Sequence, residues 1–394
     1  MKKVGILTFH RAYNFGAQVQ SYALISYLQR KYPDVMFEII DYQSKSEVRY
    51  YISSIIRNAL KVGIPAAREE MTRNKRFKEF SNSLPLSDFR IITDSSEKLF
   101  KKIDGKYYAI IVGSDAIFNW RLRKFPVPFY LGEDLHCLKI SYAASAHALK
   151  WKEAEKKEIE YCGKALSDFS YLGVRDKNTE EFVRFCTPES MIYHNCDPSL
   201  LLDMKDIFYP NIKNKLIKAG IDQNKPLILV MTADESIVRP IYEKYKTQCE
   251  FASLYLTNPV IKTIISDLTP LEWAGIFKFA KITITEYFHG TLLSLKNSTP
   301  VISIDRTDVS TGYEGKIRDV LAKRMGLEEM YFQYKDAGTE EFINRANNIV
   351  EKAMEDKYTN EIQDAINEEA KNINSFDAFF EKVLSDGCNE EQEI

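Results

Sequence analysis

Short apolar runs alternate with stretches of helical periodicity along most of this chain. The runs Val4–Thr8, Tyr108–Val112 and Pro226–Met231 are almost continuously apolar, which is typical of strands buried on both faces of a parallel sheet. Ile282–Thr285 is also predicted to be a strand. Helical stretches such as residues 17–31 lie between successive runs, and connections of this length join parallel strands. The alternation therefore predicts an α/β protein with parallel sheets covered by helices on both faces.

The strands fall into two groups. The chain has 394 residues, enough for two or three domains of about 150 residues. One group of strands ends before Pro198 and the other begins at Pro226, so we expect two doubly wound domains, residues 1–205 and 206–330. Residues 331–394 are predicted to be a C-terminal helical extension. Apolar side chains from Ile362 to Leu384 recur there every three or four positions and share one helical face, which we expect to pack against a domain.

Residues from about 45 to 100 interrupt the alternation and are predicted to be a largely helical insertion in the first domain. Eight Lys and Arg residues lie between Arg49 and Lys78. Two interpretations are open. The segment is either a solvated helical face, or a wall that meets an anionic or lipid-linked acceptor.

Composition and charge exclude several classes of protein. The net charge of −2 gives no electrostatic reason to expect a nucleic-acid partner. The six cysteines include no C-x-x-C pair, and no Cys/His cluster has zinc-ligand spacing. No run reaches the ~18 apolar residues of a membrane-spanning helix, and the N-terminal apolar run is too short for a signal peptide. We expect a cytoplasmic protein without a bound metal.

Candidate site residues in the first domain follow its strands, because ligands of open α/β sheets bind at the carboxyl ends of the strands. The loop after Val4–Thr8 contains His10, Asn14 and Gly16, and it has neither a G-x-G-x-x-G nor a Walker motif. Ser114 and Asp115 follow a second strand. Either residue can cap the next helix, and Asp115 can instead face the cleft as a base that orients a hydroxyl group.

Two further strand ends carry cationic or titratable residues. Arg175 follows the strand Tyr171–Val174, and its guanidinium group suits a carboxylate or phosphate, although an ion pair with a neighbouring carboxylate is the alternative. The segment Tyr287–Thr291 opens a helix after Ile282–Thr285. Amides at a helix N-terminus bind anions, and His289 beside such an anion can donate a proton. A buried structural role is the alternative for this histidine.

Six short segments, taken in this order, resemble the polysaccharide pyruvyl transferase family. They are Lys3–Thr8 with 14–17 and 20–24, Ile111–Asp115 with Asn119, Ser141–Ser145, Val174–Asp176, Asp197–Leu201 and Phe288–Gly290. The resemblance implies two Rossmann-like domains that face a cleft, as in GT-B glycosyltransferases. It also implies transfer of a pyruvyl group from phosphoenolpyruvate to a sugar of a cell-surface or capsular glycan precursor, which forms a pyruvate ketal and releases phosphate.

The resemblance also suggests roles for individual residues. His289 corresponds to the family's general acid and Arg175 to its contact with phosphoenolpyruvate, and we expect Asp115 to act as the base. The other expected donor-side residues are Tyr287, Phe288, Gly290 and Thr291, and the expected acceptor-side residues are His10, Asn14, Gly16 and Ser114. Phosphoenolpyruvate is the donor substrate, no cofactor or metal is expected, and the acceptor is a sugar or a lipid-linked oligosaccharide. Peripheral contact with the inner face of a membrane stays open.

One position departs from the family pattern. Some relatives have an arginine two positions before the motif histidine, where this chain has Tyr287. A second donor-binding cation must then come from elsewhere, and Arg306, Lys316 and Arg318 are the candidates. Two alternative functions stay open: a GT-B-type glycosyltransferase that uses a nucleotide sugar, and a non-catalytic binding protein for glycan assembly.

Overall fold

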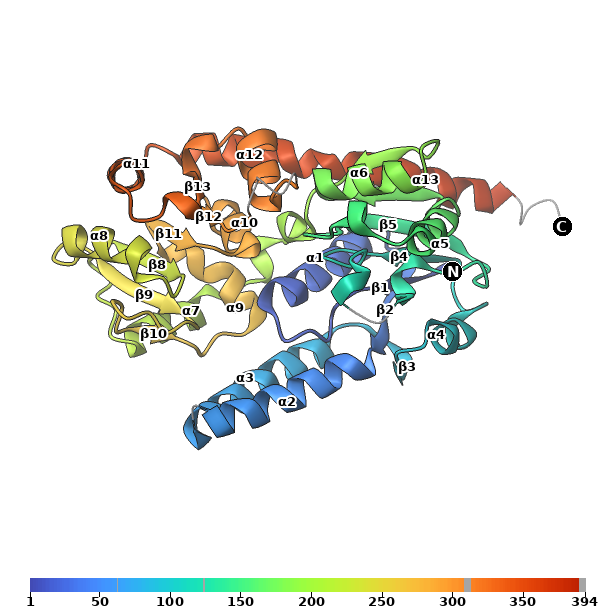
Figure 1. Ribbon diagram of the computed structural model, residues 1–394, viewed down its shortest axis with the longest axis horizontal. Helices are drawn as coiled ribbons and strands as arrows, with labels where there is room; N and C mark the ends of the chain where they lie inside the picture. Colours follow the sequence, from blue (N-terminus) through green and yellow to red (C-terminus); the bar gives the residue numbers. More distant parts are fainter. Residues whose placement is uncertain (62, 123–124, 308–312, 390–394) are drawn as a thin grey trace.

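The computed structural model describes residues 1–61, 63–122, 125–307 and 313–389, and it consists of two parallel sheets flanked by helices (Figure 1). The first sheet has the strand order β3-β2-β1-β4-β5-β6-β7, and the second has the order β10-β9-β8-β11-β12-β13. Every strand pairing between neighbours is parallel. The predicted α/β class is confirmed. We call the first sheet with its helices the first domain and the second sheet with its helices the second domain.

The central strands of the first sheet are buried on both faces, as their apolar sequences predict. In register, Val4 of β1 pairs with Ala109 of β4, and Ile6 pairs with Ile111. The seven strands are β1 (Lys3–Leu7), β2 (Met36–Gln43), β3 (Leu86–Ile92), β4 (Ala109–Val112), β5 (Leu138–Ala144), β6 (Tyr171–Val174) and β7 (Ile192–His194).

The helices of the first domain are α1 (Phe15–Lys31), α2 (Lys45–Lys61), α3 (Ile64–Ser83), α4 (Ser96–Ile103), α5 (Lys156–Leu166) and α6 (Lys177–Cys186). Most of the predicted insertion is indeed helical, with α2 and α3 forming an antiparallel hairpin. The prediction missed β3, which adds an edge strand to the sheet beside β2. Only one of its seven residues, the polar Ser87, is buried, so the apolar pattern that identified the central strands is weak here.

The second domain repeats the alternation of strand and helix. Its strands are β8 (Leu227–Met231), β9 (Glu250–Leu254), β10 (Ile264–Ile265), β11 (Ile282–Thr285), β12 (Val301–Asp305) and β13 (Tyr331–Gln333). Its helices are α7 (Tyr209–Lys218), α8 (Glu235–Tyr245), α9 (Pro270–Gly275) and α10 (Phe288–Lys296), followed by a π-helical segment, Arg318–Arg324.

The C-terminal segment begins differently from the prediction, because β13 lies beyond residue 330 and yet pairs with β12 as the last strand of the second sheet. The helices α11 (Glu340–Met354), α12 (Thr359–Ala370) and α13 (Asn374–Asn389) follow. They run along one side of both domains (Figure 1). Glu351 on α11 pairs with Lys244 on α8, whereas Asp377 on α13 accepts hydrogen bonds from two tyrosines of the first domain.

Helix α1 connects the cores of the two domains. Val19 and Ala23 on its inner face belong to the same buried cluster as Leu229 on β8 and Trp273 on α9. The N-terminal end of α1 therefore lies where the two sheets face each other. No described helix has both the length and the apolar character needed to cross a membrane.

Candidate active site

The two sheets present their topological switch points to a common space. In the first sheet, the chain reverses direction across the sheet between β1 and β4, and in the second between β8 and β11. Ligands of doubly wound sheets bind in the crevice at such a point, beyond the carboxyl ends of the strands. The loops after β1, β4 and β11 contribute Asn14, Asp115 and Tyr287 to one cavity, and Met231 at the end of β8 also lines it.

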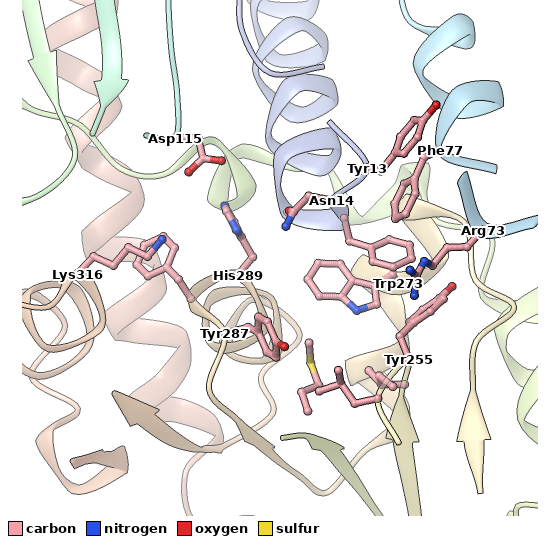
Figure 2. A pocket seen from close by; sticks show the side chains of 16 residues that line it. Tyr13, Asn14, Arg73, Phe77, Asp115, Tyr255, Trp273, Tyr287, His289 and Lys316 are labelled. Atoms are coloured by element: carbon pink, nitrogen blue, oxygen red, sulfur yellow. The ribbon is translucent and has the colours of Figure 1, made fainter. Parts of the chain in front are cut away.

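This cavity has a volume of about 370 Å³ and a charged and an aromatic end (Figure 2). Asp115, His289 and Lys316 lie at the charged end. Arg73 lies at the other end among aromatic side chains. The aromatic residues that line the cavity are Tyr13, Phe15, Phe77, Tyr255, Trp273, Tyr287 and Phe288.

His289 is the second residue of α10, and its ring contacts residues of the first domain. Its Nε2 lies 3.1 Å from Oε1 of Gln20 on α1 and 3.6 Å from Oδ2 of Asp197. Because a carboxylate oxygen only accepts hydrogen bonds, the ring nitrogen that faces Asp197 carries a hydrogen. The other nitrogen, Nδ1, lies over Gly16, where a Cβ atom would be 2.1 Å away. A ring held in this way can carry a second proton on Nδ1.

Arg175 does not line the cavity, contrary to its expected contact with the donor. Its side chain is completely buried, and its Nη1 donates a hydrogen bond of 2.6 Å to Oδ2 of Asp197. Its Nη2 lies 3.6 Å from Oδ1 of Asp115, and the Phe288 ring covers its guanidinium carbon at 4.9 Å. The alternative of an ion pair with a neighbouring carboxylate is therefore the one that the structure supports. Arg175 positions Asp115 and Asp197 from behind the cavity wall.

Asp197 joins Arg175 to His289. Burial alone would raise the pKa of Asp197, but the nearby His289 and Arg175 outweigh burial and hold this pKa well below its ordinary value. The carboxylate therefore stays ionised and orients the His289 ring, as the carboxylate of a catalytic triad orients its histidine. In the sequence, Asp197 stands out only as part of a family segment, since its role depends on a contact with a residue 92 positions away.

Asp115 lies in the left-handed region, with φ 69°, rather than at the start of an α-helix. It is therefore not a helix cap, and its carboxylate faces the cavity with 23% of the side chain exposed. Burial raises the pKa of Asp115, but Arg175, Lys316 and His289 together hold the pKa below its ordinary value. An ionised carboxylate at the edge of the cavity can accept a hydrogen bond from a substrate hydroxyl group.

Of the three candidates for a second donor-binding cation, Lys316 is the one that lines the cavity. Its Nζ lies 5.0 Å from the centre of the Phe288 ring. Burial, together with the charge of Arg175, lowers the pKa of Lys316, while the neighbouring carboxylates oppose that shift. Of the other two candidate cations, Arg306 is bound to Glu286 at 2.6 Å. The remaining one, Arg318, lies 3.9 Å from Glu314.

The expected acceptor-side residues divide into two pairs. Asn14 and Gly16 line the cavity, and Asn14 also caps α1 by accepting a hydrogen bond from the amide of Ala17. His10 does not line it. That ring is fully buried and its Nε2 lies 3.3 Å from Oδ1 of Asp41, so it is a structural histidine. Ser114 is also buried, with 1% exposure, and does not reach the cavity.

The expected donor-side residues also divide. Tyr287 and Phe288 line the cavity, whereas Gly290 and Thr291 lie beneath it. A Cβ atom on Gly290 would meet Oγ1 of Thr285 at 2.6 Å, and Oγ1 of Thr291 lies 2.6 Å from Ser303. Neither residue therefore lines the cavity, and the hydroxyl group of Thr291 is engaged within the second domain. The first-turn amides of α10 still have no partner within the helix.

The aromatic end of the cavity was not predicted. Phe15 lies at ring-centre distances of 4.6 Å from Phe77 and Tyr255 and 5.3 Å from Trp273. These residues come from α1, α3, the loop after β9, and α9. Two of these residues had a signal in the sequence. Phe15 lies in the family segment 14–17, and Phe77 lies one turn after Arg73 in the basic segment. Faces of aromatic rings beside polar groups are typical of sites that bind sugars and other small ligands.

Within the described part of the chain, no group of three or more His, Cys, Asp and Glu side chains has the geometry to hold a metal ion. The charged end of the cavity instead combines a cation, Lys316, an imidazole ring, His289, and a carboxylate, Asp115. Such a set can bind an anion, move a proton and orient a hydroxyl group.

The sequence was compared with protein families and with known proteins. The family model described as polysaccharide pyruvyl transferase matches residues 14–308, most of the chain. The matched region includes Asn14, Asp115, Arg175, Asp197 and His289. No curated protein matches the chain significantly.

Solved structures resemble the whole chain at low sequence identity. UDP-GlcNAc 2-epimerase from Neisseria meningitidis covers 97% of this chain over all of its own length, with 10% identity and a TM-score of 0.59. The epimerase from Methanocaldococcus jannaschii covers 89% of this chain and 92% of its own, with 12% identity and a TM-score of 0.52. A glycosyltransferase from Rickettsia africae covers 96% and 98%, with 10% identity and a TM-score of 0.53. These similarities confirm the predicted GT-B-like fold.

Proposed function

The chain belongs to the polysaccharide pyruvyl transferase family, and on that premise we propose that it transfers a pyruvyl group from phosphoenolpyruvate to a sugar of a glycan precursor. The observation that carries the proposal is the convergence of His289, Lys316 and Asp115 on one cavity at the two switch points. This set matches the needs of the reaction, which are anion binding, protonation of a carbon atom and activation of hydroxyl groups.

Phosphoenolpyruvate is proposed to bind at the charged end. It carries a carboxylate and a phosphate, so it requires more than one positive group. Lys316 provides a point charge, and the first-turn amides of α10 provide donors and the positive end of a helix dipole. Arg175 contributes its charge from behind Phe288 without touching the ligand. This arrangement replaces the arginine that some relatives have at the position of Tyr287.

Proton transfer begins the proposed reaction. Protonated His289 delivers a proton to the methylene carbon of phosphoenolpyruvate, which becomes the methyl group, and C2 takes on oxocarbenium character. A sugar hydroxyl oxygen forms a bond to C2 and passes its proton to a base, for which Asp115 is placed. A second hydroxyl oxygen then bonds to C2 as the bond from C2 to the phosphate oxygen breaks. The proton of this hydroxyl group restores His289, and the proton held by Asp115 leaves with the phosphate. The products are a cyclic pyruvate ketal and phosphate, with no net oxidation, so the proposed reaction uses no redox cofactor.

The acceptor is proposed to lie along the aromatic end of the cavity. Phe15, Phe77, Tyr255 and Trp273 offer apolar surface against which the C–H face of a sugar ring can pack. Arg73 stands at this end (Figure 2), and none of the ion pairs between described residues involves it. Its guanidinium group suits an anionic substituent on the acceptor. Asn14, between the two ends, can bind a sugar hydroxyl group through its side-chain amide nitrogen.

Release of phosphate from phosphoenolpyruvate tests the proposal. Purified protein is incubated with phosphoenolpyruvate and a panel of sugars carrying neighbouring hydroxyl groups. We expect acceptor-dependent phosphate release that falls at least about 100-fold in His289→Asn, the lower end of the range for loss of a general acid. The matched control is His194→Asn, which removes a histidine bound to Glu180 on the surface of the first domain. Equal activity in His289→Asn and wild type would exclude the proposed role.

A further inference from the structure

The α2–α3 hairpin, residues 45–83, carries an unusual share of the exposed apolar side chains. Its far end projects beyond the rest of the protein (Figure 1). Of the fifteen large hydrophobic side chains exposed in the described chain, six lie between residues 50 and 71: Tyr50, Ile52, Ile56, Leu60, Ile64 and Met71. Leu60 is 82% exposed. Single exposed hydrophobic residues are ordinary, but a concentration of them at a projecting tip marks an interaction site.

The exposed residues of α2 form two adjacent stripes. Ile52, Ile56 and Leu60 recur every four residues and therefore share one line along the helix. Arg57 and Lys61 follow Ile56 and Leu60 directly in sequence, so a basic line runs beside the apolar one. None of the seventeen residues of α2 is fully buried. A helix with an apolar line flanked by basic residues is typical of segments that lie in a membrane interface.

The hairpin is strongly basic compared with the rest of the chain. Residues 45–83 contain nine Lys and Arg and four Glu, a net charge of +5, whereas the whole chain has a net charge of −2. One of the four acids, Glu70, is buried and bound to Asn58, which joins the two helices. The remaining protein is therefore acidic and the hairpin attracts an anionic surface.

We propose that the α2–α3 hairpin docks this protein on an anionic lipid surface, with Ile56, Leu60 and Ile64 inserted among the headgroups. The net charge of +5 favours this partner over a second copy of the same hairpin, because two equally charged hairpins repel each other. The closeness of apolar and basic side chains also fits a lipid interface. Within one helix diameter, the apolar side chains reach the acyl chains and the basic side chains reach the headgroups.

The hairpin connects the proposed lipid surface to the cavity. Arg73 and Phe77 line the cavity and lie on the same helix as Ile64. Nine residues separate Ile64 from Arg73, which is about 14 Å along a helix. A groove of about 400 Å³ between α2, α3 and the first sheet is lined by Ile52, Ile55, Met71, Lys75 and Lys78, among others. It shares the side chain of Tyr13 with the cavity.

The position of the hairpin beside the cavity deepens the proposed function. The inference about the acceptor rests on that function: the acceptor is a lipid-linked sugar presented from the same lipid surface. Its anionic linkage would lie near Arg73 and its sugar along the aromatic end of the cavity. Docking itself is independent of the reaction, so the two ideas fail separately in experiment.

Co-sedimentation of the full chain with vesicles tests docking. The vesicles are phosphatidylcholine alone and phosphatidylcholine mixed with phosphatidylglycerol. We expect binding only to the anionic vesicles, weakened by added salt. The double substitution Arg57→Ala/Lys61→Ala is expected to weaken binding about 25-fold, or about fivefold for each residue. Ile56→Ser/Leu60→Ser is expected to weaken it at least about tenfold.

Helix α7 offers matched controls on the second domain. Lys213→Ala/Lys218→Ala removes the same charge, and Ile217→Ser removes a side chain that is 51% exposed. Both controls should bind vesicles like the wild type. Phosphate release with a water-soluble sugar should be the same in all hairpin variants, which separates docking from catalysis. Failure of the wild type to bind anionic vesicles, or equal losses in the α7 controls, would overturn the proposal. A dimer that dissociates in Ile56→Ser/Leu60→Ser without vesicle binding would also overturn it.

Discussion

The close approach of His289 to Gly16 gives a prediction that needs no knowledge of the substrate. Gly16 lies in the first turn of α1, where alanine would ordinarily stabilise the helix by up to about 1 kcal/mol. A Cβ atom at this position would, however, lie 2.1 Å from Nδ1 and 2.4 Å from Cγ of His289. Ordinary contact begins at about 3.5 Å. The ring, or the second domain that carries it, must therefore recede by more than about 1 Å.

The expected consequence differs between stability and activity. Gly16→Ala should be neutral or destabilising in the wild type, because the clash cancels the helical gain. In a His289→Ala background the clash is absent, and the same substitution should stabilise the protein by up to about 1 kcal/mol. The double-mutant cycle should therefore give a coupling of about 1 kcal/mol or more. A misplacement of about 1 Å at a catalytic group can cost about 100-fold in rate, so kcat/KM of Gly16→Ala should fall by about that factor.

Urea unfolding of the four proteins in the cycle measures the coupling. The free energies of unfolding are compared for the wild type, Gly16→Ala, His289→Ala and the double variant. If Gly16→Ala stabilised the protein equally in both backgrounds, the ring of His289 would not lie over Gly16, and the account of the charged end of the cavity would be wrong. Full activity of Gly16→Ala would contradict it as well.

Two further predictions concern buried charges. Arg175→Met should lower the free energy of unfolding by about 3–5 kcal/mol, because it leaves the buried Asp197 without its cation. Urea unfolding measures this change. A loss below about 1 kcal/mol, which is the size of an exposed ion pair, would contradict the burial of this pair. Burial raises the pKa of Asp41, but His10 and Arg11 hold this pKa well below its ordinary value, so Asp41 contributes stability above about pH 4 that is lost as the pH falls further. Unfolding followed between pH 6 and pH 3 should therefore show a smaller loss in Asp41→Asn than in the wild type, and equal losses would contradict the assignment.

Most central strands were predictable because consecutive apolar residues indicate a strand that is buried on both faces. The runs at β1, β4 and β8 are largely apolar on both faces, whereas β11 alternates isoleucine and threonine. Each of the four strands was predicted to within about a residue. The four edge strands β3, β7, β10 and β13 were missed. The first is largely exposed and follows two long helices, and the other three have only two or three residues each. Neither length nor periodicity distinguishes such strands from loops.

The site was predictable at the level of strand ends but not of side-chain direction. His289, Asp115 and Asn14 were found because they follow strands at the switch points of their sheets. His10 follows the same strand as Asn14, yet its ring turns inward to Asp41 on β2. Arg175 turns to Asp197 in the same way. Each of these contacts joins residues more than twenty positions apart, so only the folded structure shows which side chains the cavity receives.

The aromatic end of the cavity depends on packing between domains. Trp273 lies on α9 of the second domain, and Phe15 and Phe77 lie on helices of the first. Phe15 belongs to a family segment, whereas Phe77 and Trp273 belong to no motif, and an aromatic residue in an amphipathic helix is ordinarily part of a core. These residues line one cavity only because α1 lies between the two sheets.

The central claim is that phosphoenolpyruvate binds at the charged end of the cavity, and thermal unfolding with added ligand tests it most directly. Phosphoenolpyruvate at 100 times its Kd should stabilise the wild type by about 2.7 kcal/mol. The shift should be lost in Lys316→Met and kept in Lys323→Met, a lysine paired with Glu314 outside the cavity. A UDP-sugar that stabilises the wild type where phosphoenolpyruvate does not would contradict the account and favour a nucleotide-sugar transferase.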